Sequence, residues 1–212
     1  MKNTFIVGAN GAVGRLLVAQ MKEKNMSFTA GVRKQEQVDT LQTDGINAKL
    51  IDLTGSVDDL VKAFSGADSI IFSAGSGGKT GDDMTLEIDL DGAVKTMEAA
   101  QIAGVKRYVM VSSIYADKRE TVDASPIRPY MIAKFYADRE LRRSTLDYTI
   151  LHPGYLTNDE PTGKILVDDT SDNIKISRSD VAASLIHLLN NDKSIRKDYT
   201  IVNGDKPIET AF

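Results

Sequence analysis

The sequence predicts an α/β fold in which a doubly wound, mainly parallel sheet carries helices on both faces. Short β-rich segments alternate with helical patterns, which is typical of parallel strands joined by right-handed crossovers. A glycine-rich turn stands between the first such strand and the first helix. The length of 212 residues and the 42% hydrophobic content fit one ordinary core. We therefore expect one domain over residues 1–212.

The sequence predicts six strand segments before residue 155, at 4–9, 27–33, 48–53, 69–74, 107–113 and 147–154. Beyond Pro153 the alternation loosens, with strand-like residues 164–167 and 198–203 and a helix expected at about 179–190. We expect residues 153–212 to complete the sheet and to border the substrate site.

Two crossover helices follow from apolar residues at helical spacing. Their apolar positions are Val13, Leu16, Leu17 and Met21 in the first and Val57, Leu60, Val61 and Phe64 in the second. The second helix has a capping-box-like start, in which Ser56 is followed three residues later by Asp59. Each apolar stripe is expected to pack on a sheet face.

The turn after the first strand has glycines at every third position, in the order Gly8, Gly11 and Gly14. Glycine lets the backbone turn sharply and approach a diphosphate, and the amides and dipole of a helix N-terminus favour that negative charge. The alternative is a tight turn without a ligand. Because strand, turn and helix follow one another, we predict a dinucleotide site. Its contacts are Gly8, Asn10, Gly11, Ala12, Val13 and Gly14.

The end of the second strand favours NADP(H), although NAD(H) is possible. An NAD site usually places a carboxylate about 20 residues beyond the turn, whereas residues 29–34 contain no acid and two cations. Arg33, with Lys34 beside it, is expected to meet the 2′-phosphate, because a guanidinium binds phosphate bidentately. The alternative is a solvated loop. Asp52 and Leu53, after the third strand, are expected near the adenine, although Asp52 could instead cap the next turn.

Residues 73–80 follow the fourth strand and resemble a phosphate loop, ending in Gly78, Lys79 and Thr80. The first glycine of that motif is replaced by Ser73, and Gly81, Asp82 and Asp83 form a poor start for the helix it requires. We therefore expect a loop beneath the dinucleotide, with Ala74 and Gly75 close to the ribose and nicotinamide.

Tyr130 and Lys134 are four residues apart, so on a helix their side chains share one face. A lysine ammonium beside a phenol stabilises the phenolate and lowers a tyrosine pKa from about 10, which permits proton exchange with a substrate oxygen. The alternative is a pair of ordinary surface residues. Ser112 and Ser113 end the fifth strand at the carboxyl edge, where such sheets bind ligands. We expect Ser113 to orient the substrate and Ser112 to lie by the cofactor.

His152, Pro153 and Gly154 end the sixth strand, where we expect a loop against the nicotinamide and not a catalytic imidazole.

With two distant histidines and no cysteine, no metal site or disulfide is expected. The net charge of −4, with both signs interspersed, argues against nucleic-acid binding. No long apolar run or signal-peptide core is present. We expect a cytoplasmic protein that acts on a small molecule without a membrane partner.

Taken together, these motifs resemble the atypical short-chain dehydrogenase/reductases, with similarity also to epimerase/dehydratase relatives. The matching segments are the glycine turn, residues 111–113, residues 130–134, residues 146–154 and residues 179–182. The resemblance implies a Rossmann-type fold, NADP at the turn, and Ser113, Tyr130 and Lys134 as the catalytic set.

The expected activity is NADPH-dependent hydride transfer to a small carbonyl, quinone or flavin-like acceptor. In it we expect Lys134 both to lower the pKa of Tyr130 and to bind the nicotinamide ribose of the cofactor. A non-catalytic NADP(H)-binding redox sensor and an NAD(P)-dependent epimerase or dehydratase are the alternatives. We expect residues 76–84, 115–128 and 154–165 to line the substrate pocket. The sequence predicts no particular oligomeric state.

Overall fold

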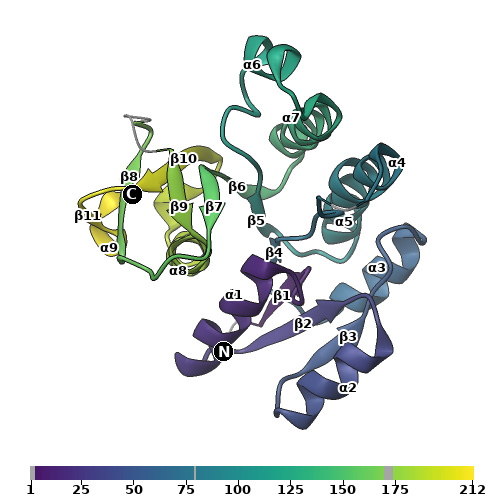
Figure 1. Cartoon of the computed structure of the whole chain (residues 1–212). Coiled ribbons are helices and arrows are strands. Elements are labelled where there is room, and N and C mark those ends of the chain that lie inside the picture. Colours follow the sequence, from purple (N-terminus) through teal and green to yellow (C-terminus); the bar gives the residue numbers. More distant parts are fainter. Residues whose placement is uncertain (1–2, 79, 170–173) are drawn as a thin grey trace.

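The computed structural model describes residues 3–78, 80–169 and 174–212. Within these residues, nine strands form one sheet in the order β11-β8-β10-β6-β5-β4-β1-β2-β3 (Figure 1). All neighbouring pairs from β3 across to β10 are parallel, and β8 runs antiparallel to both β10 and β11. The predicted single-domain α/β fold is confirmed, because β3-β2-β1-β4-β5-β6 is the Rossmann strand order.

The main sheet and a small second sheet together hold the following strands: β1 (Thr4–Val7), β2 (Phe28–Val32), β3 (Ala48–Leu50), β4 (Ser69–Phe72), β5 (Arg107–Val111), β6 (Asp147–Pro153), β8 (Lys164–Val167), β10 (Lys197–Asn203) and β11 (Lys206–Pro207), with β7 (Tyr155–Thr157) and β9 (Lys175–Ser177) forming the second sheet. The helical segments are α1 (Ala12–Glu23), α2 (Gln35–Thr43), α3 (Val57–Phe64), α4 (Asp82–Met84), the π-helix η1 (Thr85–Gly92), α5 (Ala93–Ile102), α6 (Arg119–Ala124), α7 (Arg128–Arg143), α8 (Arg178–Leu189), the 3₁₀ segment η2 (Asp192–Ser194) and α9 (Ile208–Ala211).

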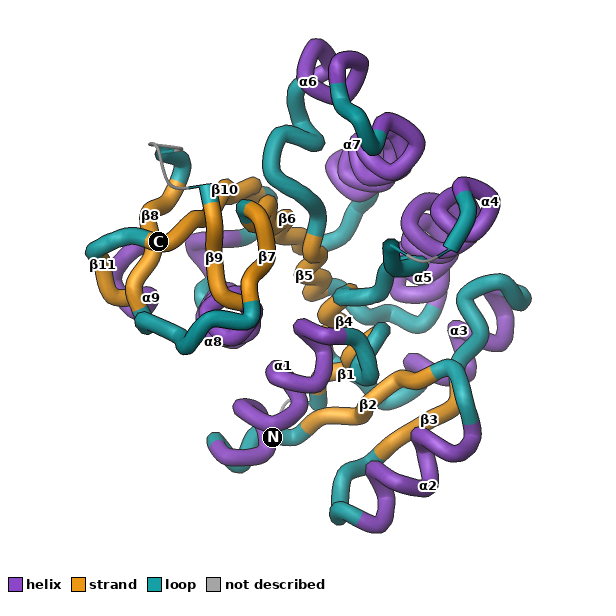
Figure 2. Tube along the Cα trace, viewed as in Figure 1, coloured by secondary structure: helices purple, strands orange, loops and turns teal. Residues whose placement is uncertain are grey.

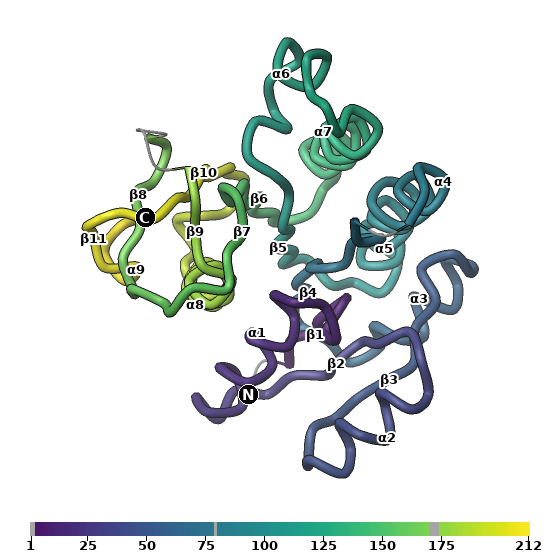
Figure 3. The backbone as a smooth tube through the Cα atoms, viewed as in Figure 1, coloured from purple at the N-terminus to yellow at the C-terminus, as the bar shows by residue number. Residues whose placement is uncertain are grey.

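Each strand predicted before residue 155 is present. β3 is shorter than expected because it is the edge strand and pairs with β2 only over Ala48–Leu50. The tail adds β10 beside β6, which places the C-terminal segment at the opposite end of the sheet from β2 and β3 (Figure 3). The β7 and β9 pair was not predicted, because three-residue strands are too short to show an alternation.

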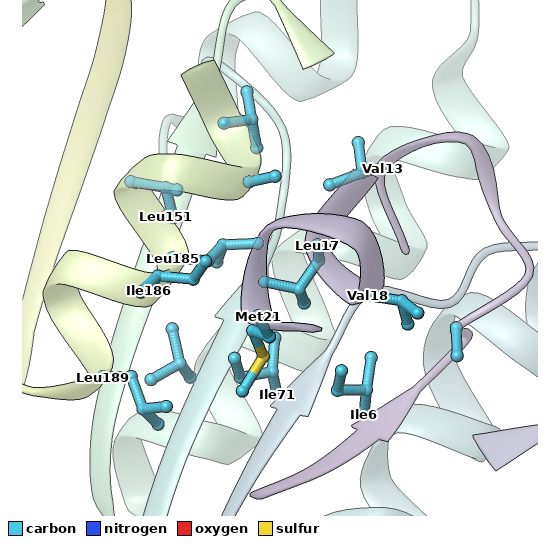
Figure 4. Packing of buried hydrophobic residues seen from close by; sticks show 14 of the residues in the cluster. Ile6, Val13, Leu17, Val18, Met21, Ile71, Leu151, Leu185, Ile186 and Leu189 are labelled. Atoms are coloured by element: carbon cyan, nitrogen blue, oxygen red, sulfur yellow. The ribbon is translucent and has the colours of Figure 1, made fainter. Parts of the chain in front are cut away.

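Helices cover both faces of the sheet, as the tube in Figure 2 shows. Successive side chains of β1 point to opposite faces, so Ile6 joins one core cluster while Phe5 and Val7 join the other. The first cluster is formed with α1 and α8, which lie side by side (Figure 4). The second is formed with α3, α5 and α7. The sheet is therefore buried on both faces, as parallel sheets require.

The apolar face of α1 differs in one position from the prediction. Leu16 is 36% exposed, whereas Val13, Leu17, Val18 and Met21 are buried. Leu16 was wrongly placed in the core stripe, because the helix turns its Val18 side, and not its Leu16 side, towards the sheet.

The start of α3 agrees with its sequence. The Ser56 hydroxyl accepts a hydrogen bond from the Asp59 amide at 3.2 Å and donates to the Asp59 carboxylate at 2.8 Å. Such a cap stabilises a helix by about 1 kcal/mol.

Candidate functional site

A cavity of about 540 Å³ lies at the carboxyl ends of the first four strands. Loops after all four contribute to its wall, and two side chains of the α4 and η1 segments close it. Its lining residues are Gly8, Asn10, Gly11, residues 31–33, residues 50–54, residues 73–76, Met84 and Ile88. The cavity spans the point between β1 and β4 where the strand order reverses, which is where open α/β sheets bind their ligands.

The three glycines of the turn differ in how strongly the fold requires glycine at their positions. Gly8 has φ +86°, and a Cβ there would lie 2.7 Å from Ala74 Cα. A Cβ on Gly14 would overlap the Gly8 carbonyl oxygen and lie 2.9 Å from Ala9 Cα. Gly11 is exposed, has an ordinary φ of −69°, and its Cβ would be 3.2 Å from the Gly8 oxygen. Fold geometry thus accounts for Gly8 and Gly14, whereas Gly11 is left with its backbone facing the cavity.

The N-terminus of α1 fits an anionic group. Gly11 is its N-cap residue, no side chain among the described residues caps the helix, and its first turn carries no acidic residue. The first amides of Ala12 and Val13 therefore lack an intrahelical acceptor, and the helix dipole adds a partial positive charge. Asn10 is exposed and lines the cavity, while the Val13 side chain is buried in the core. Of Val13, only the backbone is available to a ligand.

The ends of β2 and β3 carry the residues predicted to select the cofactor. Arg33 is exposed at the cavity wall and forms no ion pair with any described residue. Lys34 is outside the lining and pairs with Glu36 at 3.3 Å. The Asp52 carboxylate accepts from the Thr54 amide and hydroxyl at 2.8 and 2.7 Å, which hold the pKa of that carboxyl below its usual value. Leu53 is half-buried in the wall.

Ala74 and Gly75 line the cavity, as expected for a loop beneath the cofactor. A helix does begin at Asp82, contrary to the prediction of a poor helix start, and it continues into η1. Lys79, which belongs to the phosphate-loop alternative, lies outside the described residues.

One residue that the sequence did not single out, Asp89 of η1, connects this loop to Lys134. Its Oδ2 accepts from the Ser76 amide at 2.9 Å, and its Oδ1 lies 3.2 Å from Lys134 Nζ.

Tyr130 and Lys134 lie on α7, as predicted, with the Lys134 ammonium 5.6 Å from the centroid of the Tyr130 ring. Lys134 Nζ also donates to the Val111 carbonyl at 3.5 Å, at the end of β5. Burial alone would lower the pKa of Lys134, but the negative charges of the Tyr130 phenolate and of Asp89 raise it above its ordinary value. Lysine therefore stays charged beside the phenol. Ser113 is half-buried immediately after β5.

The side chains of Ser112 and His152 do not point at the cavity. Both contact Asp138, one turn after Lys134 on α7, with Ser112 Oγ and His152 Nε2 each 2.9 Å from Asp138 Oδ2. His152 and Pro153 are part of β6 and not of a loop. Burial alone would lower the pKa of His152, but the hydrogen bond and charge of Asp138 raise it. This buried network joins the ends of β5 and β6 to α7.

Gly154 has a packing reason of its own, since its Cβ would lie 3.0 Å from the Ile174 carbonyl carbon and from Val202 Cγ1. Ser76 and Met84, from the predicted lining segment 76–84, do line the cavity. None of the lining residues comes from segments 115–128 and 154–165, whose role at a substrate site stays a prediction.

The fold and the cavity define a Rossmann-type protein with a cavity at the carboxyl edge of the sheet, bordered by the β1–α1 turn. A family model described as NAD(P)H-binding matches residues 8–192. The chain belongs to this NAD(P)H-binding family.

Relatives match nearly the whole chain. The uncharacterised sugar epimerase YhfK of Bacillus subtilis is 43% identical over 98% of this chain and 97% of its own. A Bacillus halodurans structure described as an NAD-dependent epimerase/dehydratase has 39% identity and a TM-score of 0.89, covering 99% of this chain and 97% of that one. The oxidoreductase ylbE of Lactococcus lactis has 37% identity and a TM-score of 0.88, covering 99% and 94%.

Two buried carboxylates, Asp89 and Asp138, were missed in the sequence. Asp138 could have been found, because it follows Lys134 by four residues on the same helix face. Asp89 could not have been found, because its position depends on the π-helical turn of η1.

In the described part of the chain, no helix has the length and apolar character to cross a bilayer.

Proposed function

We propose that the protein is an NADPH-dependent oxidoreductase that transfers hydride to a small carbonyl, quinone or flavin-like acceptor in the cytoplasm. The observation that carries the proposal is the buried Lys134 ammonium over the Tyr130 ring, at the sheet edge that also forms the cofactor cavity. A bound nicotinamide supplies or accepts the hydride, and the protein orients and polarises the acceptor.

Each catalytic residue has a defined role in this proposal, and Lys134 also binds the nicotinamide ribose. Tyr130 donates a proton to the acceptor oxygen through its hydroxyl. Lys134 keeps a positive charge beside that phenol, supported by Asp89 at 3.2 Å. Ser113, directly after β5, hydrogen-bonds the acceptor oxygen and orients it. General acid catalysis of this kind contributes about 10²–10⁴-fold to a rate.

The preference for NADPH is proposed from the wall of the cavity at the ends of β2 and β3. The exposed Arg33 has no described carboxylate partner, so its guanidinium is available to a 2′-phosphate. Asp52 follows β3, and only its Oδ1 accepts from Thr54. At the end of β2 itself, residues 29–34 contain no acid that could bind a ribose 2′-hydroxyl.

The catalytic role is tested with the Tyr130→Phe variant, measured by NADPH oxidation with a panel of quinones, aldehydes and flavins. We expect kcat to fall at least 100-fold while the Kd for NADPH changes less than threefold. Tyr136→Phe is the matched control, because Tyr136 lies on the same helix and packs against Phe135. Full activity of Tyr130→Phe would exclude the proposed proton donor.

The cofactor preference is tested by binding NADPH and NADH to Arg33→Ala. We expect NADPH to bind about 10-fold to 100-fold more weakly and NADH to be unaffected, because a hydrogen bond to a charged group is worth about 1.5–3 kcal/mol. Lys24→Ala is the control and should change neither affinity, because Lys24 is an exposed cation at the C-terminal end of α1. An unchanged preference in Arg33→Ala would remove Arg33 from the proposal.

An NAD(P)-dependent epimerase or dehydratase is the second candidate, supported by the description of YhfK, at 43% identity, as a sugar epimerase. Such an enzyme regenerates its cofactor in each cycle. It would retain NAD(P) through purification and show no net NADPH oxidation with any acceptor. Binding of NADPH with neither activity would favour the redox sensor.

A further inference from the structure

Asp89 lies on the helical segment that separates the cofactor cavity from α7. The segment η1 is a π-helix, a form that is rare and often found at functional sites. Ile88 of η1 and Met84, directly before it, line the cavity. Gly92 of η1 packs closely on the cavity wall, because its Cβ would lie 3.0 Å from Leu53 Cβ. One short segment thus touches both the cavity and, through Asp89, the proposed catalytic lysine.

The two oxygens of Asp89 have different partners. Oδ2 accepts from the Ser76 amide at 2.9 Å, and Oδ1 forms the ion pair with Lys134 Nζ at 3.2 Å. The side chains of Asp89 and Lys134 are 1% and 5% exposed. Gly75 is fitted against the same carboxylate, because its Cβ would lie 3.0 Å from Oδ1. The carboxylate therefore links the loop at the cavity to the lysine on α7.

The charges around Lys134 leave Asp89 as its direct counter-ion. Tyr130 and Asp138 share helix α7 with Lys134, and His152 faces this region from β6. Asp138 Oδ2 is already shared by Ser112 and His152. Among the described residues, Asp89 is the carboxylate within ion-pair distance of Lys134 Nζ, and a buried cation without such a partner is costly.

We infer that Asp89 is a positioning residue, which holds the Lys134 ammonium at the carboxyl edge of the sheet and ties it to the loop bordering the cofactor cavity. The inference rests on the proposed function, because Lys134 acts there through Tyr130. Asp89 itself touches neither the acceptor nor the reacting atoms. Its effect on the reaction is the charge and the place of Lys134.

The isosteric variant Asp89→Asn separates the charge from the hydrogen bond, because the amide oxygen of asparagine still accepts from Ser76. An opposite charge at this distance moves a pKa by about one to three units. We expect Lys134 in Asp89→Asn to lose its proton about one to three pH units lower than in the wild type. This is measured by NMR of protein labelled with ¹³C-lysine, with the Lys134 signal assigned from Lys134→Arg.

Asp91→Asn is the matched control, because Asp91 lies two residues along the same segment and pairs with Lys95 at 2.6 Å near the surface. This control should leave the Lys134 titration unchanged. An unchanged Lys134 titration in Asp89→Asn would overturn the inference.

Kinetics give a second readout. In Asp89→Asn the alkaline limb of the kcat profile should move to lower pH with the lysine, while the Kd for NADPH changes less than threefold. A tenfold loss of NADPH affinity with an unmoved alkaline limb would contradict the inference. The NMR titration needs no acceptor, so a shifted lysine in a protein that oxidises no NADPH would defeat the proposed activity and leave the ion-pair role standing.

If Asp89→Asn does not fold, the double variant Asp89→Asn/Lys134→Met tests whether the lost ion pair is the cause. Recovery of folding on removal of both charges would support the ion pair, because the single variant then fails through an uncompensated buried cation. A double variant that also fails to fold would contradict it.

Discussion

Gly11→Ala is expected to impair cofactor binding while leaving the fold almost unchanged. Gly11 has φ −69° and ψ 168°, which any residue adopts, and its new Cβ would lie 3.2 Å from the Gly8 oxygen and 3.8 Å from the Ser73 oxygen. Alanine is a poorer N-cap than glycine, at a cost of up to about 1 kcal/mol. It also restricts the unfolded chain, which stabilises the fold by about 0.4–1 kcal/mol. The two effects nearly cancel, so the free energy of unfolding should change by less than about 1 kcal/mol.

Gly11 lines the cavity, and we expect the added methyl group of Gly11→Ala to hinder the approach of the proposed diphosphate to the backbone. We expect the Kd for NADPH to rise at least tenfold by isothermal calorimetry, with urea unfolding measured on the same samples. Gly14→Ala is the contrasting variant. Its Cβ would lie 2.9 Å from Ala9 Cα, so the strain should cost about 1–3 kcal/mol or more of stability. Undiminished NADPH binding by Gly11→Ala would refute this account of the turn.

Two further predictions concern stability. The raised pKa of His152 means that its pairing with Asp138 stabilises the fold fully below the unfolded pKa of about 6.5, and that this contribution is lost as pH rises through the folded value. The unfolding free energy of wild type minus that of His152→Gln should therefore fall as pH rises above about 6.5, and a difference that grows with pH would contradict it. Leu17→Ala should lower the free energy of unfolding by about 2–5 kcal/mol, because Leu17 is fully buried against the sheet and α8 (Figure 4). Leu16→Ala should lower it by about 0.5 kcal/mol, because Leu16 is 36% exposed. Equal losses of stability in the two variants would show that α1 packs differently.

The sequence predicted the main strands and their mainly parallel arrangement, because these buried strands are apolar and each is followed by a helix or a turn with its own signal. Ser56 at the start of α3 is an example, since the cap depends only on neighbouring residues. The β7 and β9 pair was not predictable in this way. It depends on contacts such as Gly154 against Ile174, which are distant in the chain and have no periodic pattern.

The candidate site was predictable where one local segment forms it, as in the glycine turn or the Tyr130 and Lys134 pair on α7. The side-chain directions of Ser112 and His152 were not predictable, because both side chains are hydrogen-bonded to Asp138 on helix α7. Asp89 was hidden for a similar reason, since the π-helix and not the residue spacing brings it to Lys134. Buried polar networks depend on tertiary packing, which local patterns do not encode.

We propose that the turn from Gly8 to Gly14 binds the diphosphate of a dinucleotide. Calorimetric titration of the protein with NADPH and NADH tests this binding. We predict saturable binding of NADPH, with NADH at least tenfold weaker. No heat of binding with either coenzyme, oxidised or reduced, at millimolar concentration would contradict it.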